Sequence, residues 1–200
     1  MQLHQKCFPL RDEKTEALKP HFIAIANIES EDVDAMRAGF ERVIRPRLAD
    51  AEFFFDQDCA TPLADRVNGL NDMLFQKDLG TVADKASRLK DAAPWFAEQL
   101  DLESETLERA IALAKCDLLT EMVGEFPELQ GVMGRYYADV SSEPAEVAMA
   151  IEQHYWPKNA GDCLPTTPLA AAVAMADRAD TLIGVFGVGL KPKGSKDPFA

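Results

Sequence analysis

Apolar residues recur three or four positions apart over most of the chain, which is the spacing of one face of an α-helix. The longest run predicts a helix that begins near Ser104 and has an apolar face formed by Leu107, Ile111, Ala114, Leu118 and Met122. Gly124 is typical of a helix end and Pro127 of a helix start. A second helix is therefore expected directly after the first.

The first 30 residues follow a different pattern. QKCFPL and HFIAIANI are short runs rich in β-type residues, and the polar RDEKTEALKP between them suits a hairpin or a longer connection. Ser30 is then expected to cap a helix with the apolar face Val33, Met36, Phe40, Val43 and Ile44. Pro46 should kink or end this helix, because proline removes an intrahelical hydrogen bond.

Further helix starts are marked by capping residues. Thr61-Pro62 and Thr167-Pro168 are cap-and-first-turn pairs, Thr81 and Asp84 approximate a capping box, and Pro144 opens another helix. The residues expected inward include Leu63, Val67, Leu70 and Leu74 in the first of these helices and Leu169, Val173, Ala176 and Ile183 in the last. The fold class is therefore mainly α: residues 1–78 form an α+β segment, and residues 79–200 form a helical domain with an extended tail.

Composition restricts the class of protein. Two hundred residues with 47 % hydrophobic content can form a sizeable core, and no apolar run approaches the length of a membrane span. The N-terminus has no apolar signal core, and the four cysteines lie far apart without metal-ligand spacing. These features indicate a cytoplasmic protein with reduced thiols and no membrane partner.

The formal charge of −13 argues against extended contact with nucleic acid, which needs clustered lysine and arginine. Arg42, Arg45 and Arg47 nevertheless lie together around Pro46. They could hold phosphate or pair with nearby carboxylates, and ion pairing is favoured by about two to one because exposed charge runs usually face solvent. The adjacent Phe53, Phe54 and Phe55 cannot all face one core, so one of them should meet another part of the protein.

The segment LAKCDLLTEMVGEFPELQGVMGRYYA and the closing GSKDPFA resemble the β subunit of the bacterial heterotetrameric glycyl-tRNA synthetase. The similarity extends through HQKCFP, NIES, ERVIRPRLADAEFFFDQD and FQKDLGT. Since that subunit is several times longer, the resemblance implies an internal region of it. It also implies that aminoacylation, with ATP and Mg, occurs on a separate α subunit. This chain would then carry no cofactor and would bind tRNA(Gly), the α subunit and the rest of the β chain.

The helical domain also resembles the HD phosphohydrolase superfamily, in which two His and two Asp residues hold a divalent metal that activates water. The matching positions are Lys85, the pair Cys116-Asp117, and Asp177, so a cation and a thiol replace the two histidines. We expect a degenerate pocket with no metal and no catalytic residue, in which Lys85 pairs with Asp117 or Asp177. His154 is either a leftover ligand or, at about four to one, a core histidine.

The tail GLKPKGSK has the glycine spacing of a phosphate-binding loop but not its Gly-Lys-Ser/Thr ending. A simpler interpretation is a cationic loop that contacts a phosphate backbone. The candidate tRNA contacts, chosen by charge and loop position, are Arg42, Arg45, Arg47, Arg135, Lys191, Lys193 and Lys196. Two alternatives remain open: a metal-dependent HD-type phosphohydrolase that uses Asp117, Asp177 and His154, and an interface piece without binding activity of its own.

Overall fold

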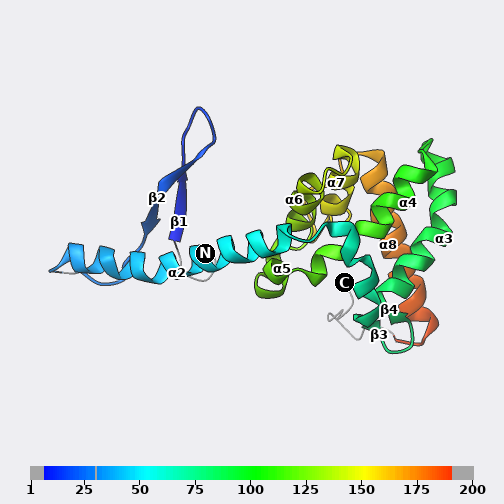
Figure 1. Cartoon of the computed structure of the whole chain (residues 1–200), viewed down its shortest axis with the longest axis horizontal. Helices are drawn as coiled ribbons and strands as arrows, with labels where there is room; N and C mark the ends of the chain where they lie inside the picture. Colours follow the sequence, from blue (N-terminus) through cyan, green and yellow to red (C-terminus); the bar gives the residue numbers. More distant parts are fainter. Residues whose placement is uncertain (1–6, 30, 191–200) are drawn as a thin grey trace. The chain divides into compact units, whose positions relative to one another are not determined.

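The computed structural model describes residues 7–29 and 31–190, and these residues fall into two compact units (Figure 1). The first unit ends at Glu52 and the second begins at Phe53. Helix α2 (Val33–Cys59) contains this division. Helices account for most of the described residues, which confirms a mainly α fold with a small α+β segment.

The first unit contains one antiparallel hairpin. Strand β1 (Cys7–Arg11) pairs with β2 (Leu18–Ala24), and Phe8 lies opposite Ile23 in the register. The hairpin expected from the two β-type runs is therefore confirmed. Apolar side chains on it, such as those of Phe8 and Ile23, are largely exposed.

Pro46 does not end helix α2, which continues to Cys59. A proline removes only one intrahelical hydrogen bond, and the helix keeps its other bonds on both sides. Of the predicted apolar face only Ile44 is buried, whereas Val33 and Val43 are exposed. The predicted cap Ser30 lies outside the described residues.

The second unit is a set of helices with one small hairpin. Its bounds are the 3-10 helix η1 (Leu63–Asp72), strands β3 (Leu74–Gln76) and β4 (Gly80–Thr81), and helices α3 (Val82–Leu100), α4 (Ser104–Leu113), α5 (Glu121–Glu125), α6 (Val132–Val140), α7 (Ala145–Gln153) and α8 (Pro168–Gly187). The short 3-10 helices η2 (Cys116–Leu119) and η3 (Pro127–Leu129) lie on either side of α5. Helix α8 packs against α3 and α7, and α4 packs against α3 and α7 (Figure 1).

Residues 53–78 belong to this second unit. Helix η1 contacts α3, α4 and η2, and the buried side chains of Leu63 and Leu70 are part of the helical core. The compact units therefore divide earlier than the boundary at residues 78 and 79 suggested by the sequence. Leu74, which was expected inward on a helix, lies instead on strand β3 and is exposed.

Local capping explains several helix starts. Thr81 and Asp84 form a reciprocal capping box at α3, because the Thr81 side chain accepts from the Asp84 N–H and the Asp84 side chain accepts from the Thr81 N–H. The Thr167 hydroxyl accepts from the Ala170 N–H at α8, where Pro168 occupies the first turn. These two starts are confirmed.

The prediction of one long helix from Ser104 to Met122 is wrong. Helix α4 ends at Leu113, and the chain passes through η2 before α5 begins. The side chain of Ser104 does not cap α4, since Glu103 occupies the N-cap position. Within the described residues, no helix is long and apolar enough to cross a membrane.

Candidate functional site

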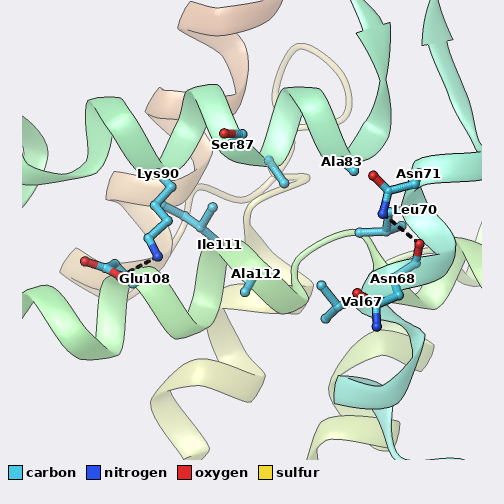
Figure 2. Close-up of a pocket in the computed structure, with 11 residues that line it drawn as sticks. Val67, Asn68, Leu70, Asn71, Ala83, Ser87, Lys90, Glu108, Ile111 and Ala112 are labelled. Carbon is cyan, nitrogen blue, oxygen red and sulfur yellow. Dashed lines mark hydrogen bonds and ion pairs between the residues drawn. The ribbon is translucent and has the colours of Figure 1, made fainter.

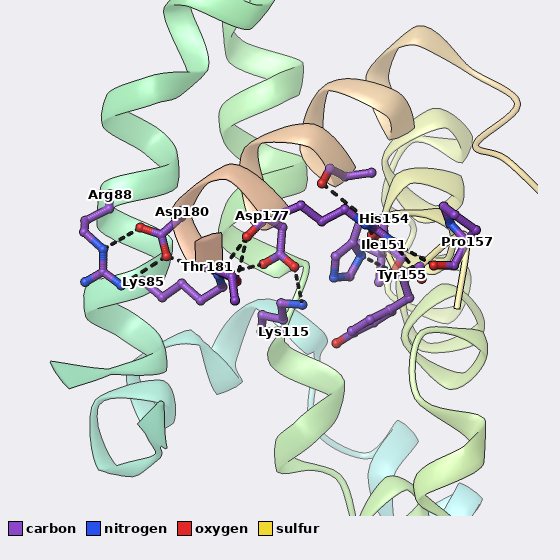
Figure 3. A network of polar contacts seen from close by, with 12 residues as sticks. Lys85, Arg88, Lys115, Ile151, His154, Tyr155, Pro157, Asp177, Asp180 and Thr181 are labelled. Atoms are coloured by element: carbon purple, nitrogen blue, oxygen red, sulfur yellow. Dashed lines mark hydrogen bonds and ion pairs between the residues drawn. The ribbon is translucent and has the colours of Figure 1, made fainter. Parts of the chain in front are cut away.

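The break between α4 and α5 places two charged residues inside the helical unit. Lys115 directly precedes η2, and Asp117 lies within it and is fully buried. The Lys115 side chain lies next to Asp177 of α8 and Tyr155 (Figure 3). Helix α8 contributes Asp177, Asp180 and Thr181 from three positions along its length. We call Lys85, Lys115, Asp117, His154, Asp177 and Asp180 the charged cluster.

Lys85 is one cation of the charged cluster. It lies on α3 and is only 3 % exposed. Its ammonium donates to the carbonyl oxygen of Asp177 at 3.0 Å and to the hydroxyl of Thr181 at 2.7 Å. It also forms ion pairs with Asp177 at 3.3 Å and with Asp180 at 3.1 Å. Figure 3 shows these contacts, which join α3 to α8.

Lys115 is the second cation, and its partner is again Asp177. The Lys115 Nζ lies 3.4 Å from Asp177 Oδ2 and 4.1 Å from the centre of the Tyr155 ring. Burial lowers the pKa of Lys115, and the nearby Asp177 carboxylate opposes that shift. The two lysines therefore hold one carboxylate between them.

The two acidic groups respond to burial in opposite ways. Burial disfavours the charged form of Asp177, but Lys115 and Lys85 outweigh it and lower the pKa to about 2. Burial raises the pKa of Asp117 to about 6, although the Gly131 N–H, which donates to Asp117 Oδ2 at 2.6 Å, and Lys115 favour its charged form. Asp177 is thus a carboxylate at neutral pH. Asp117 changes its protonation state close to neutral pH.

His154 is a buried neutral imidazole. Burial lowers its pKa to about 3, and the charge of Lys115 acts in the same direction. Its Nδ1 lies 2.8 Å from the carbonyl oxygen of Ile151, which can only accept, so Nδ1 carries the proton. Its Nε2 is buried and has no hydrogen-bond partner within residues 7–29 and 31–190.

The Cys116 thiol forms no hydrogen bond to Lys85, His154 or Asp177 among the described residues. Its sulfur bonds to the carbonyl oxygen of Ala112. Burial raises the pKa of the thiol to about 12, and the charge of Asp117 adds to this shift. A thiol of that pKa is protonated at neutral pH. The structure therefore brings Lys85, His154 and Asp177 together and leaves Cys116 as a core residue.

Sequence reasoning missed Lys115, Asp180 and Arg88. Arg88 donates to Asp180 from Nε at 2.6 Å and from Nη2 at 3.1 Å, and its Nη1 donates to the carbonyl oxygen of Leu79 at 2.9 Å. The signal was present as spacing: Arg88 and Asp180 each follow a predicted pocket residue by three positions, on the same helix face. Lys115 directly precedes the Cys116-Asp117 pair.

This arrangement has consequences for metal binding. A divalent ion at Asp177 would have to approach two ammonium groups, which repel it. Among the described residues, no group of three or more His, Cys, Asp and Glu side chains could hold a metal ion. The charged cluster can join helices α3, α7 and α8, and it presents neither an activated nucleophile nor an open cation site.

The candidate phosphate-binding residues lie in different surroundings. Arg42 and Arg45 are exposed on α2, and neither has an ion-pair partner within the described part of the chain. Arg47 is also exposed, and it is engaged in an interaction. Arg135 forms an ion pair with Glu152 at 3.0 Å and lies over the Tyr136 ring. Lys191, Lys193 and Lys196 lie outside the described residues.

A small groove lies on another face of the second unit. It has a volume of about 260 Å³ and is formed by η1, α3 and α4, with Asn68, Asn71 and Ser87 among its polar residues (Figure 2). The Lys90–Glu108 ion pair, at 2.9 Å, closes one end of it. It holds no cluster of groups suited to acid–base chemistry.

The fold and the charged cluster define a helical domain in which ion pairs of Lys85 join α3 to α8. A family model described as the glycyl-tRNA synthetase beta subunit matches residues 1–200. The chain therefore belongs to the glycyl-tRNA synthetase β subunit family, as the resemblance predicted.

Curated relatives agree with this family. The glycine–tRNA ligase beta subunits of Chromohalobacter salexigens and Aliivibrio fischeri are each 51 % identical to the chain over its full 200 residues, and that of Coxiella burnetii is 49 % identical. The chain spans 29 % of the length of each of these relatives.

Proposed function

We propose that this chain is part of the β subunit of a glycine–tRNA ligase and that it contributes to tRNA binding and assembly. The ATP- and Mg-dependent aminoacylation would then occur on a separate α subunit. Family membership over all 200 residues supports this proposal.

The observation that carries the tRNA contact is the pair Arg42 and Arg45. They lie three residues apart on α2, so their side chains share one helix face. Both are exposed and lack an ion-pair partner within the described residues, contrary to the ion pairing favoured by the sequence. Exposed guanidinium groups of this kind suit phosphate oxygens, which they can hold through two hydrogen bonds. Lys191, Lys193 and Lys196 stay candidate tRNA contacts by their charge, and they lie outside the described residues.

Arg47 and Arg135 are weaker candidates. Arg135 would have to leave Glu152 and the Tyr136 ring to reach a phosphate. We therefore place the primary contact at Arg42 and Arg45.

The test is charge reversal in the full-length β subunit assembled with its α subunit. R42E/R45E should weaken tRNA(Gly) binding. It should also reduce the slope of log affinity against log salt concentration by about two, one for the phosphate contact of each arginine. R11E/K14E is the matched control, because it makes the same charge change at exposed positions of the same unit. ATP–pyrophosphate exchange with glycine, which needs no tRNA, should be unchanged in both. Equal tRNA affinity for R42E/R45E and wild type would refute the assignment.

A further inference from the structure

Helix α8 has an exposed apolar face between Met175 and Phe186. Successive residues on a helix are about 100° apart, which places Met175, Ala179, Leu182, Ile183 and Phe186 within one arc of about 100°. We call these five residues the α8 stripe. It carries no charged side chain.

The α8 stripe is exposed in the second unit. The exposed fractions are 45 % for Met175, 58 % for Leu182, 74 % for Ile183 and 51 % for Phe186. With side chains of about 200 Å² each, this amounts to roughly 400–500 Å², as large as the largest apolar patch on a typical monomer. Ile183 was expected to face inward, and that expectation is wrong.

Contacts on the opposite side of α8 explain why the α8 stripe is exposed in the second unit. Leu169, Val173 and Ala176 are buried against neighbouring helices, and a Cβ at Gly184 would lie 2.9 Å from the Leu79 side chain. Lys85 and Lys115 hold Asp177 on the inner side through ion pairs (Figure 3). These contacts fix the rotation of α8, so the stripe cannot turn inward without breaking them.

The chemistry of the stripe excludes tRNA as its partner. Contact with a phosphate backbone needs cations, and the stripe has none. Arg178, the cation beside it, donates instead to the carbonyl oxygens of Ala174, His154, Tyr155 and Pro157. An uninterrupted apolar face is typical of a permanent interface, which resembles a domain core, whereas transient interfaces are as polar as ordinary surface.

The length of the relatives supports one occupant. This chain spans 29 % of the length of its relatives, so most of each of those subunits lies outside the region that these 200 residues match. We propose that the α8 stripe is covered by that remainder of the same β chain, within the folded subunit. The proposal depends on family membership and does not depend on Arg42 and Arg45 binding tRNA.

Hydroxyl-radical footprinting of the full-length β subunit tests this without a mutation. In the β subunit alone, labelling of Met175, Leu182, Ile183 and Phe186 should fall to the level of Leu169 and Val173, which are buried on the inner side of the same helix. Labelling that persists in the subunit alone and also in the α–β assembly would overturn the proposal. Protection that appears only when the α subunit is added, or only at high β-subunit concentration, would overturn it too, because the occupant would then be the α subunit or a second copy.

A variant provides a second measurement. I183E in the full-length subunit should restore labelling at Met175 and Phe186, because a buried carboxylate would force the covering segment away. L164E is the matched control, since Leu164 is an exposed leucine of the same unit outside the stripe. Restored labelling in I183E but not in L164E is the expected result, and equal labelling in both variants would contradict the proposal.

Discussion

The buried ammonium of Lys115 is the part of the charged cluster that sequence reasoning did not anticipate, and its removal gives a measurable loss of stability. In K115M the methionine keeps most of the side-chain stem and removes only the charge and its donors. Asp177 would retain Lys85, at 3.3 Å, but lose the second cation at 3.4 Å. Asp117 would lose a nearby positive charge.

The magnitude follows from the distance and the burial. Two unit charges 3.4 Å apart attract by about 5 kcal/mol at an effective dielectric constant of about 20. The burial cost of the lysine offsets part of this attraction, because that cost disappears with the charge. Removal of one partner of a buried pair costs about 3–5 kcal/mol, and the remaining Lys85 contact places K115M near the lower end, at about 3 kcal/mol.

The assay is urea unfolding of the 200-residue chain at pH 7, followed by far-ultraviolet circular dichroism. K90M is the matched control, because Lys90 also forms an ion pair, with Glu108 at 2.9 Å, but on the surface. That pair should contribute at most about 1 kcal/mol. Hydrogen exchange of the α8 amides in the full-length subunit gives an independent measure and should be faster in K115M only.

A double-mutant cycle identifies the partner. In the double variant K115M/D177N, the loss of unfolding free energy should be about 1–3 kcal/mol smaller than the sum of the losses in the two single variants, because the two groups are in contact. A K115M variant that is as stable as K90M, or additive costs in the cycle, would refute the view that Lys115 is a paired ammonium inside the domain.

Three further predictions concern groups in the second unit. The pKa of Asp117 is about 6 in the folded chain against an ordinary 3.8, so its contribution to stability is complete below pH 3.8 and is lost as pH rises through 6. The unfolding free energy of wild type should therefore fall by about 3 kcal/mol between pH 4 and 7 through Asp117, and this fall should be absent in D117N. Unfolding free energies that change equally with pH in D117N and wild type would contradict this. D58A should lower the free energy of unfolding in urea by about 3 kcal/mol, because the buried Asp58 carboxylate accepts hydrogen bonds from two backbone N–H groups and from Tyr137. The control D56A, at an exposed neighbour, should change it by less than about 0.5 kcal/mol. Cys163, which is exposed, should react with iodoacetamide in the native chain, and the buried Cys116 should react only after unfolding; mass spectrometry of the labelled chain distinguishes them.

Local signals allowed several elements to be predicted from the sequence. The starts of α3 and α8 depend on hydrogen bonds between residues three apart, at Thr81–Asp84 and Thr167–Ala170, and such bonds need no distant partner. The hairpin of the first unit was likewise visible as two β-type runs separated by polar residues.

Elements that depend on distant partners could not be predicted in the same way. The apolar spacing continues from Leu107 to Met122, but the chain leaves the helix after Leu113 and turns Lys115 towards Asp177, which lies far along the sequence. Ile183 has the spacing of a buried residue on a helix that is apolar all round, so periodicity alone could not decide which side faces the core. Lys85 was expected to pair with Asp117 or Asp177, and it pairs with Asp177. That expectation came from the family resemblance rather than from local pattern.

The hydrogen bonds of Asp58 determine where this chain can be shortened. Asp58 lies in the last turn of α2, yet its carboxylate accepts from the N–H groups of Glu121 and Met122 at the start of α5. A truncation that begins at Phe53 keeps this acceptor with the helices it serves. One that begins after Cys59 leaves both N–H groups and the Tyr137 hydroxyl without it. The last turn of α2 is therefore an integral part of the smallest piece that can be expressed as the helical domain.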